Sequence, residues 1–388
     1  MVVDIIVVVV LVLAAIAGLR RGLVASIGAL VGFALGALLA YAVVPFLAGL
    51  WPWPAWRGVV ALIAAIAIVA ILTGAGAAIG ALLRRGVDRV RLRPADRLLG
   101  GVLSVVVAAL AASLVGQSLS LLGVPVVSSA VSSSNVLRVI EDITPRPVAT
   151  TLAQLRGTLL QDGLPRLDGL LVPAETFAAP DVSLDDPVLE AAAQSVARVS
   201  GVAYACGKGS SGSGFVAAPD RVVTNAHVVA GVDTPLVELP GRAGLEGRVV
   251  YFDPVDDLAI VAVDGLDAAV LPVVPTPGPG SDAVVQGYPW GGPFTMTPAR
   301  ILSVGPAPIP DIYDGPAQLR DIATLAGEVH PGNSGGPLLT PDGAVAGLVF
   351  ARSETDDTIG FALTSDELAP ALSQTAADAP VSTGPCTP

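Results

Sequence analysis

The chain has 388 residues, of which 53% are hydrophobic and 14% are charged, and its formal net charge is −12. This length predicts about two or three domains. Residues 1–122 carry nine arginines and three acidic residues, a net charge of +6, whereas residues 123–388 carry 12 basic and 30 acidic residues, a net charge of −18. The acidic second part argues against nucleic-acid binding, which requires a basic surface.

Four long apolar stretches precede residue 123 and predict an α-helical transmembrane domain over residues 1–122. They are Val2–Leu19, Leu23–Val44, Val59–Leu83 and Leu98–Leu122. Each has roughly the 20 residues that a helix needs to cross a hydrocarbon core of about 30 Å. One alternative, buried helices of a large soluble core, is disfavoured by four successive uncharged stretches. The other, a signal peptide over the first stretch, lacks a positive n-region after Met1.

The placement of arginines predicts the orientation of these spans. Two lie between the first and second spans, and six lie between the third and fourth: Arg20, Arg21, Arg84, Arg85, Arg89, Arg91, Arg93 and Arg97. The loop between the second and third spans has one arginine and three interfacial tryptophans: Arg57, Trp51, Trp53 and Trp56. Arginine-rich loops stay in the cytoplasm. We therefore expect an integral cell-membrane protein, in contact with the lipid bilayer, with residues 123–388 on the extracytoplasmic (periplasmic) side.

The predicted spans contain small residues at helical spacing and no ionisable side chain well inside them. Gly28, Gly32 and Gly36 recur every four residues, as do Gly76 and Gly80, and this spacing allows helices of one chain to approach closely. A proton or ion pathway has no candidate residue, which argues against a channel. The four-span pattern resembles the membrane domain of colicin V production (CvpA-type) proteins.

Residues 123–187 form a predicted extracytoplasmic linker. Serine clusters and six prolines disfavour long helices there: Pro145, Pro147, Pro165, Pro173, Pro180 and Pro187. We expect a short helix near Val148–Leu160, and apolar residues at helical spacing predict another over Val188–Val199. The sequence leaves open whether the linker is ordered or self-cleaved.

From about Val199 onward, short β-rich runs alternate with turn residues. The expected strands are Gly214–Val216, Arg221–Thr224, Gly247–Phe252, Leu258–Val263, Ala283–Gly287, Gly343–Phe350 and Thr358–Leu363. Several short strands with Gly, Pro and Asp turns indicate a sandwich or a barrel. Residues 188–388 therefore predict an all-β domain that has room for two small antiparallel barrels with a cleft between them.

Two motifs in this domain carry residue types that nucleophilic catalysis uses. The sequence GNSGGP over Gly332–Pro337 places Ser334 in a glycine-rich loop, where backbone N–H groups can converge on one point. Attack on a carbonyl requires such donors beside a nucleophile. His227 lies in the sequence TNAHVV, 107 residues (334 − 227) before Ser334. Taken alone, the GNSGG sequence fits a common flexible loop as well as a catalytic one, and a single histidine is more often structural. The two motifs in this order, together with the sequences SGF and DLA, disfavour coincidence.

The chain order His, Asp, Ser is that of chymotrypsin-like enzymes. The sequences SGF at 213–215, TNAH at 224–227, DLA at 257–259, GYP at 287–289 and GNSGGP at 332–337 resemble trypsin-like proteases of the bacterial HtrA/Deg group. The whole arrangement resembles the actinobacterial membrane-anchored acid-resistance serine proteases of the MarP type. This resemblance implies a chymotrypsin-like double β-barrel and a serine endopeptidase that cleaves protein or peptide substrates in the cell envelope, in acid resistance or envelope stress.

The resemblance also implies catalytic roles. Ser334 is expected to attack the peptide carbonyl, His227 to move the proton, and an aspartate to hold the imidazole. We assign that aspartate to Asp257, because it directly precedes the sequence Leu-Ala as in the resembling family. Asp256 is the main competitor, and Asp253 is a weaker one.

The substrate contacts follow from the same resemblance. The backbone N–H groups of Gly332 and Ser334 should form the oxyanion hole. Glu328, six residues before the nucleophile, should lie near the base of the S1 pocket, and Phe350-Ala351-Arg352 should line its wall. Glu328 would favour a basic P1 side chain unless Arg352 neutralises it.

Cys206 and Cys386 are the only cysteines. An even count in an oxidising compartment predicts a disulfide that pins the C-terminal tail to the first barrel; two free thiols are the alternative. With His227 and His330 as the only histidines, we expect no metal site and no cofactor. His330 is expected in a loop near the cleft, where its charge could tune activity with pH.

A function of another class stays open beside the protease. The chain could be a membrane scaffold or transport accessory that carries an inactive protease-like domain. The complete set of His227, Asp257 and Ser334 disfavours this alternative, because a decayed protease usually loses one of the three.

Overall fold

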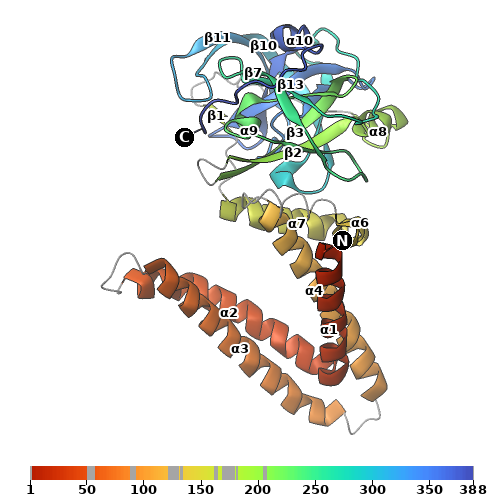
Figure 1. Ribbon diagram of the computed structural model, residues 1–388, viewed down its shortest axis with the longest axis vertical. Helices are drawn as coiled ribbons and strands as arrows, with labels where there is room; N and C mark the ends of the chain where they lie inside the picture. Colours follow the sequence, from red (N-terminus) through yellow and green to blue (C-terminus); the bar gives the residue numbers. More distant parts are fainter. Residues whose placement is uncertain are drawn as a thin grey trace. The chain divides into compact units, whose positions relative to one another are not determined.

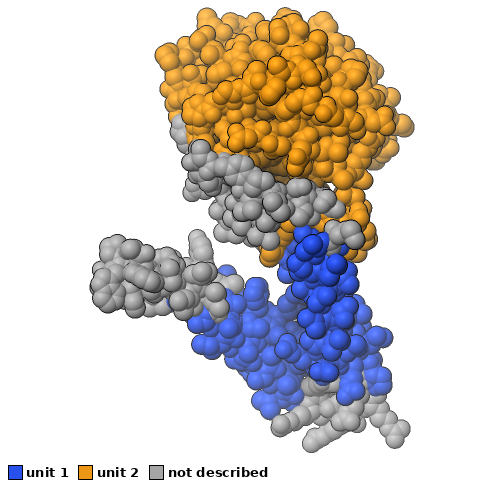
Figure 2. All heavy atoms as spheres, in the orientation of Figure 1, with its two compact units in different colours: residues 1–113 blue, residues 114–388 orange. Residues whose placement is uncertain are grey.

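The computed structural model describes residues 2–49, 57–87, 93–120, 131, 134–160, 165–167, 180, 182–203 and 208–387. The chain divides into two compact units, residues 1–113 and residues 114–388 (Figure 2). The first unit is helical, and every described strand belongs to the second (Figure 1).

Four apolar helices account for the four predicted stretches: α1 (Val2–Arg21), α2 (Leu23–Gly49), α3 (Arg57–Val87) and α4 (Arg93–Ser120). Within the described residues, two stretches are long and apolar enough to cross a membrane, Val2–Arg21 and Pro94–Gly116. The apolar stretches found in α2 and α3 are shorter, Leu23–Gly36 and Ala67–Leu83. All four stretches are therefore helical where they are described, and within the described residues two of the four predicted spans qualify as membrane spans by length and composition.

The glycines of α2 and α3 lie where these two helices meet. A Cβ atom on Gly28 would overlap the carbonyl oxygen of Gly76, and one on Gly76 would overlap that of Gly28. Gly32 approaches the backbone of Leu72 in the same way. The two backbones thus approach at distances that only glycine permits, and the contact predicted from the four-residue spacing lies within one chain.

Two helices precede the strands of the barrels in the second unit, α6 (Asn135–Ile143) and α7 (Arg146–Leu160). The sequence predicted most of α7 but did not predict α6. α7 packs against the 3-10 turn η3 (Pro289–Gly291), where the side chain of Ala153 is buried. Part of the predicted linker is therefore folded against the β domain.

The helix predicted over Val188–Val199 is right at its start and wrong at its end. Helix α8 runs from Pro187 to Ala193, and the side chain of its N-cap residue Asp186 accepts a hydrogen bond from the next turn. Strand β2 then begins at Val196. Apolar residues that fit helical spacing also fit a strand whose both faces are buried, so tertiary burial decided between the two.

The first barrel-like sheet has seven strands in the order β6-β5-β2-β3-β4-β8-β7, and all neighbours are antiparallel. The strands are β2 (Val196–Ala203), β3 (Lys208–Ala218), β4 (Arg221–Thr224), β5 (Leu236–Glu238), β6 (Leu245–Glu246), β7 (Arg248–Asp253) and β8 (Leu258–Ala262). The short helix α9 (Ala226–Val229) follows β4. Small aliphatic side chains such as those of Val199, Val216 and Val261 form a buried core cluster of this sheet.

The second sheet has the order β1-β13-β12-β9-β10-β11-β14, and β13 also pairs with β14. Its strands are β1 (Arg166–Leu167), β9 (Asp282–Gly287), β10 (Thr295–Ile309), β11 (Gln318–Ala326), β12 (Pro337–Leu339), β13 (Val345–Ser353) and β14 (Ile359–Thr364). Helix α10 (Ser365–Leu372) follows β14. The β domain therefore has two barrel-like sheets, as a trypsin-like fold requires, and each predicted strand overlaps an observed one.

The longest missed strand is β10, which contains Pro298, Pro306 and Pro308. Proline removes a donor from a strand ladder and argues against a strand in sequence. Here the strand accommodates the prolines. Its first part, Thr295–Arg300, pairs with β9, and Arg300–Ile309 pair with β11 in a long hairpin.

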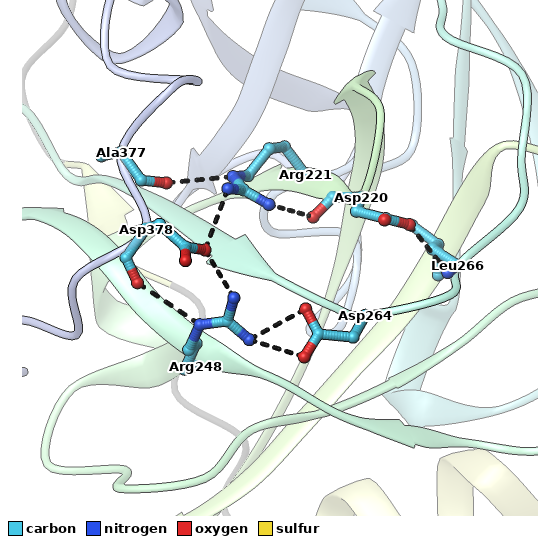
Figure 3. Close-up of polar contacts among 7 residues, drawn as sticks. All are labelled: Asp220, Arg221, Arg248, Asp264, Leu266, Ala377 and Asp378. Atoms are coloured by element: carbon cyan, nitrogen blue, oxygen red, sulfur yellow. Dashed lines mark hydrogen bonds and ion pairs between the residues drawn. The ribbon is translucent and has the colours of Figure 1, made fainter.

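The C-terminal segment after α10 crosses back onto the first sheet (Figure 3). Asp378 forms ion pairs with Arg221 of β4, at 3.2 Å, and with Arg248 of β7. Hydrogen bonds from Arg248 are the main reason that the pKa of Asp378 lies below its usual value. Further along, the backbone N–H of Val381 donates to the carbonyl of Val249 at 2.9 Å. The tail is thus attached to the first sheet by polar contacts on the surface.

The predicted disulfide falls partly outside this description. No cysteine among the described residues is free. Cys206 lies outside the described residues, so its pairing with Cys386 stays a prediction.

Candidate active site

His227 and Asp257 are joined by two hydrogen bonds. His227 lies in α9, directly after β4, and Asp257 directly precedes β8. Nδ1 of His227 lies 2.8 Å from Oδ2 of Asp257, and the backbone N–H of His227 donates to Oδ1 at 2.9 Å. Both side chains are largely shielded from solvent, at 9% and 4% exposure. A carboxylate at Nδ1 favours the tautomer with the proton on Nδ1, which leaves Nε2 able to accept a proton.

The backbone of Asp257 is held in an unusual conformation. Its φ angle is 54°, in the left-handed region that few residues other than glycine adopt. The side chain of Asn225 donates to the carbonyl oxygen of Asp257 at 2.8 Å. Such conformations persist where surrounding contacts enforce them, and they cluster at functional sites.

The two competing aspartates serve other contacts. Asp253 accepts a hydrogen bond from the backbone N–H of Asp256 at 3.1 Å and one from the hydroxyl of Tyr251 at 3.2 Å. Burial, followed by the charge of Asp253, raises the pKa of Asp256. Of the three aspartates, only Asp257 hydrogen-bonds to His227 among the described residues.

The loop Gly332–Pro337 is fixed by strands of both sheets. The backbone N–H of Ser213, in β3, donates to the carbonyl oxygen of Ser334 at 2.7 Å. The backbone N–H of Gly335 donates to the carbonyl oxygen of Val349, in β13, at 2.8 Å. Ser334 is 2% exposed and lies between the first sheet, which carries His227, and the second.

Two glycines of this loop occupy conformations that other residues rarely adopt. The φ angles of Gly332 and Gly335 are 94° and 81°. A Cβ atom on Gly332 would overlap the carbonyl oxygen of Tyr288, and one on Gly335 would overlap that of Ser213. Glycine is therefore required at both positions for the loop to reach its place.

The backbone N–H groups of Gly332 and Ser334 have no acceptor in the part of the chain that the structure describes. The neighbouring N–H groups do have acceptors. The N–H of Asn333 donates to the carbonyl oxygen of His330 at 2.9 Å, and the N–H of Gly335 donates to that of Val349. Buried N–H groups without an acceptor cost free energy. Two such donors beside Ser334 are what an oxyanion would need.

The hydroxyl of Ser334 is not hydrogen-bonded to His227. The two hydrogen bonds of His227 with described residues both go to Asp257. Catalytic hydrogen bonds of this kind often tighten only when substrate binds, so an open contact does not argue against the pair.

The turn η3 supports the other side of the loop. Trp290 has a φ angle of 55°, and its backbone N–H donates to the carbonyl oxygen of Pro331. Its ring stacks on the imidazole of His330, with centroids 4.3 Å apart and planes inclined by 23°. The residues that lead into Gly332 therefore rest on a strained tryptophan, a support that the sequence did not predict.

The predicted pocket residues divide between the surface and the core. Nε2 of His330 lies 3.6 Å from Oε2 of Glu328, whose side chain is 66% exposed. Burial lowers the pKa of His330, an effect that Glu328 opposes and Arg352 reinforces. Arg352 forms its ion pair with Asp357, at 3.0 Å. The adjoining pocket residues Phe350 and Ala351 are buried.

Ser213 supports the loop of Ser334 through side-chain hydrogen bonds. In the sequence, only the SGF motif at 213–215 pointed to this residue. Its hydroxyl donates to the carbonyl oxygen of Gly332 at 2.7 Å and accepts from the backbone N–H of Tyr288 at 2.9 Å. Among the described residues, no cluster of three or more His, Cys, Asp or Glu side chains could hold a metal ion.

Known proteins resemble both parts of the chain. The trypsin-like peptidase domain family matches residues 212–348, and the colicin V production protein family matches residues 3–145. Serine protease Rv3671c of Mycobacterium tuberculosis is 36% identical over 389 residues, which cover 99% of this chain and 98% of that protein. Putative serine protease HhoB of Synechocystis is 36% identical over 159 residues, 39% of this chain and 37% of that protein.

A solved structure extends the comparison. The crystal structure of the Rv3671c protease in its active form is 39% identical and covers 57% of this chain and 100% of that chain, with a TM-score of 0.51. The segment matched by the trypsin-like family, residues 212–348, contains His227, Asp257 and Ser334.

Proposed function

Because this chain belongs to the family of the serine protease Rv3671c and is a membrane-anchored serine endopeptidase, we propose that His227, Asp257 and Ser334 are its catalytic triad. The observation that carries the proposal is the double contact of His227 with both carboxylate oxygens of Asp257. This contact supports Asp257, the residue assigned from the sequence, over its competitors Asp256 and Asp253 as the orienting carboxylate.

In the proposed reaction, Oγ of Ser334 attacks the carbonyl carbon of the scissile peptide bond, and its proton passes to Nε2 of His227. The imidazolium is stabilised by Asp257 and then donates this proton to the leaving amine, which leaves an acyl group on Ser334. A water molecule then attacks the acyl group on Ser334, with His227 again moving the proton, and the carboxylic acid product is released.

The N–H groups of Gly332 and Ser334 would stabilise the oxygen of the tetrahedral intermediate. Their lack of an acceptor among the described residues and the enforced conformation of Gly332 support this role. Each donor of this kind is typically worth about 2.7–4 kcal/mol of transition-state stabilisation.

The setting of the site is part of the proposal. Four spans with both arginine-rich loops in the cytoplasm would place the protease domain outside, facing proteins of the cell envelope. The proposed division is a membrane domain at 1–122, a linker at 123–187 and a protease domain at 188–388. Glu328 and the strand Phe350–Arg352 are proposed to line the substrate pocket, and the Cys206–Cys386 disulfide is proposed to attach the C-terminal tail to the first barrel. Self-cleavage of the linker stays the open alternative that the sequence left.

Labelling of the full-length protein in detergent tests the triad. Wild type and Ser334→Ala would be incubated with a fluorophosphonate probe and with unfolded casein, beside Ser382→Ala as a control at an exposed serine. We expect labelling and cleavage in wild type and Ser382→Ala, and a loss of about 10⁴–10⁶-fold in kcat for Ser334→Ala. Labelling of Ser334→Ala would show another nucleophile, and folded protein without any labelling would favour the inactive scaffold.

A further inference from the structure

The edge of β13 beside the Ser334 loop is occupied by a segment of the chain's own linker. One edge of β13 pairs with β14. On the other edge, β12 pairs as far as Leu348, and the backbone N–H of Val349 donates to the carbonyl of Gly336 at 2.9 Å. Three residues further along the strand, β1 pairs with Arg352 and then with Ser353. The nucleophile loop and the linker strand are thus neighbours along one strand.

The linker strand is short but specifically held. Arg166 pairs with Arg352 and Leu167 with Ser353, in parallel orientation. The backbone N–H of Arg352 donates to the carbonyl oxygen of Pro165 at 3.2 Å. Leu167 is half-buried and packs against a core cluster to which both sheets contribute. It is the one parallel pairing between named strands that the described part of the chain contains.

This edge is where an extended peptide would dock. A peptide with its scissile bond at Ser334 would continue alongside Phe350 and Ala351, which lie between the loop and the linker strand and are buried in this structure. Extended peptides bind exposed sheet edges by adding a strand, through main-chain hydrogen bonds. A peptide that continues along β13 reaches Arg352, whose N–H is already bonded to Pro165.

We propose that Pro165–Leu167 act as an internal occupant of the peptide-docking edge of β13 and restrict the binding of extended substrates until they are displaced. The inference rests on the proposed function, because it takes Ser334 as the nucleophile. A pairing of two residues is readily displaced, so the segment lowers apparent affinity by the fraction of time it stays bound. Short ligands that reach Ser334 without pairing to Arg352 escape this restriction.

The first test compares Leu167→Pro with Leu167→Ile in the full-length protein. Proline removes the backbone N–H and the apolar anchor at 167, whereas isoleucine keeps both. The substrate is an internally quenched decapeptide that spans a casein cleavage site. We expect Leu167→Pro to lower KM about threefold or more and to leave kcat unchanged, while Leu167→Ile matches wild type. A KM that is unchanged or raised in Leu167→Pro would overturn the inference.

Fluorophosphonate labelling separates this inference from the proposed function. The probe is small and does not need the edge of β13, so its rate of reaction with Ser334 should be equal in wild type and both variants. Absence of labelling in wild type would refute the proposed nucleophile. Equal labelling with no change in KM would refute the linker occupancy alone.

A second measurement does not depend on the folding of Leu167→Pro. Hydrogen exchange would be followed in full-length Ser334→Ala with and without a saturating amount of the same decapeptide. If the peptide displaces the linker strand, the exchange rate of peptides that contain Leu167 rises about tenfold or more, while those from β13 become or remain protected. Bound peptide without faster exchange at Leu167 would contradict the inference.

Discussion

The helical unit and the β unit place opposite kinds of residue at their contacts. In the first, glycines lie between α2 and α3, and large apolar side chains face outward, with Leu38 and Ile71 at 67% and 68% exposure. In the second, Phe215 and Phe361 are 0% and 1% exposed. Outward apolar residues suit a lipid solvent, in which close packing of small residues holds helices together, whereas water drives large apolar residues inside.

This difference shows that a high content of apolar residues serves two structural roles in one chain. In the helical unit it suits contact with lipid and leaves little chemistry, since the predicted spans lack internal charges. In the β unit it builds a rigid frame around a few polar groups, such as Asn225, Asp257 and Ser334, which are all buried. Substitutions that affect one unit and spare the other test this difference.

The largest effect should come from Asp257→Asn, which removes the negative charge and replaces one of the two oxygens that accept from His227 by an N–H donor. We expect kcat to fall about 10⁴-fold, because the imidazole loses its proper tautomer. Asp256→Asn is the matched control, since Asp256 does not contact His227. Steady-state kinetics on the casein decapeptide would measure both. Equal losses in the two variants would contradict the assignment of Asp257.

A smaller loss should follow from Gly332→Ala. The new Cβ atom would overlap the carbonyl of Tyr288 at a φ of 94°, so the loop must shift and misplace an oxyanion donor. We expect kcat to fall about 10²–10³-fold with a smaller change in KM. Gly305→Ala, at a position with open space around it, is the control. An unchanged kcat in Gly332→Ala would argue against this oxyanion hole.

Gly28→Leu tests the other unit. The side chain would separate α2 from α3 and destabilise their contact by about 1–3 kcal/mol, as overpacking does in other proteins. Gly74→Leu, where a Cβ meets open space, should have little effect. Thermal unfolding of the helices in detergent, followed by circular dichroism, would measure the difference. Fluorophosphonate labelling should stay unchanged in both, and equal destabilisation by the two would show that the glycine contact is unimportant.

The smallest effect concerns pH. Burial lowers the pKa of His330 from its ordinary value of 6.5, so folding favours the neutral imidazole. This contribution to stability is present above about pH 6.5 and is lost as the pH falls through the lowered pKa. His330→Phe keeps a ring to stack on Trp290 but does not titrate. The Tm of the variant should therefore fall less than that of wild type between pH 7 and acid, and parallel curves would exclude His330 as a source.

Local patterns determined much of this protein. The apolar stretches, the strands with regular turn residues, and the loops of His227 and Ser334 are all recognisable from neighbouring residues, because each depends on a short-range period or a glycine requirement. The helix expected over Val188–Val199 and the missed strand β10 show the limit. There, burial and hairpin pairing overrode the local signals of apolar spacing and proline.

The tertiary structure alone decided how distant residues combine. Three aspartates within five residues fit the sequence pattern, and the left-handed backbone at 257 selects the one that meets His227. The support of Trp290 for the loop before Ser334 and the pairing of Arg166 with Arg352 join parts of the chain far apart in sequence. Such contacts depend on the closure of the two sheets, so no local spacing reveals them.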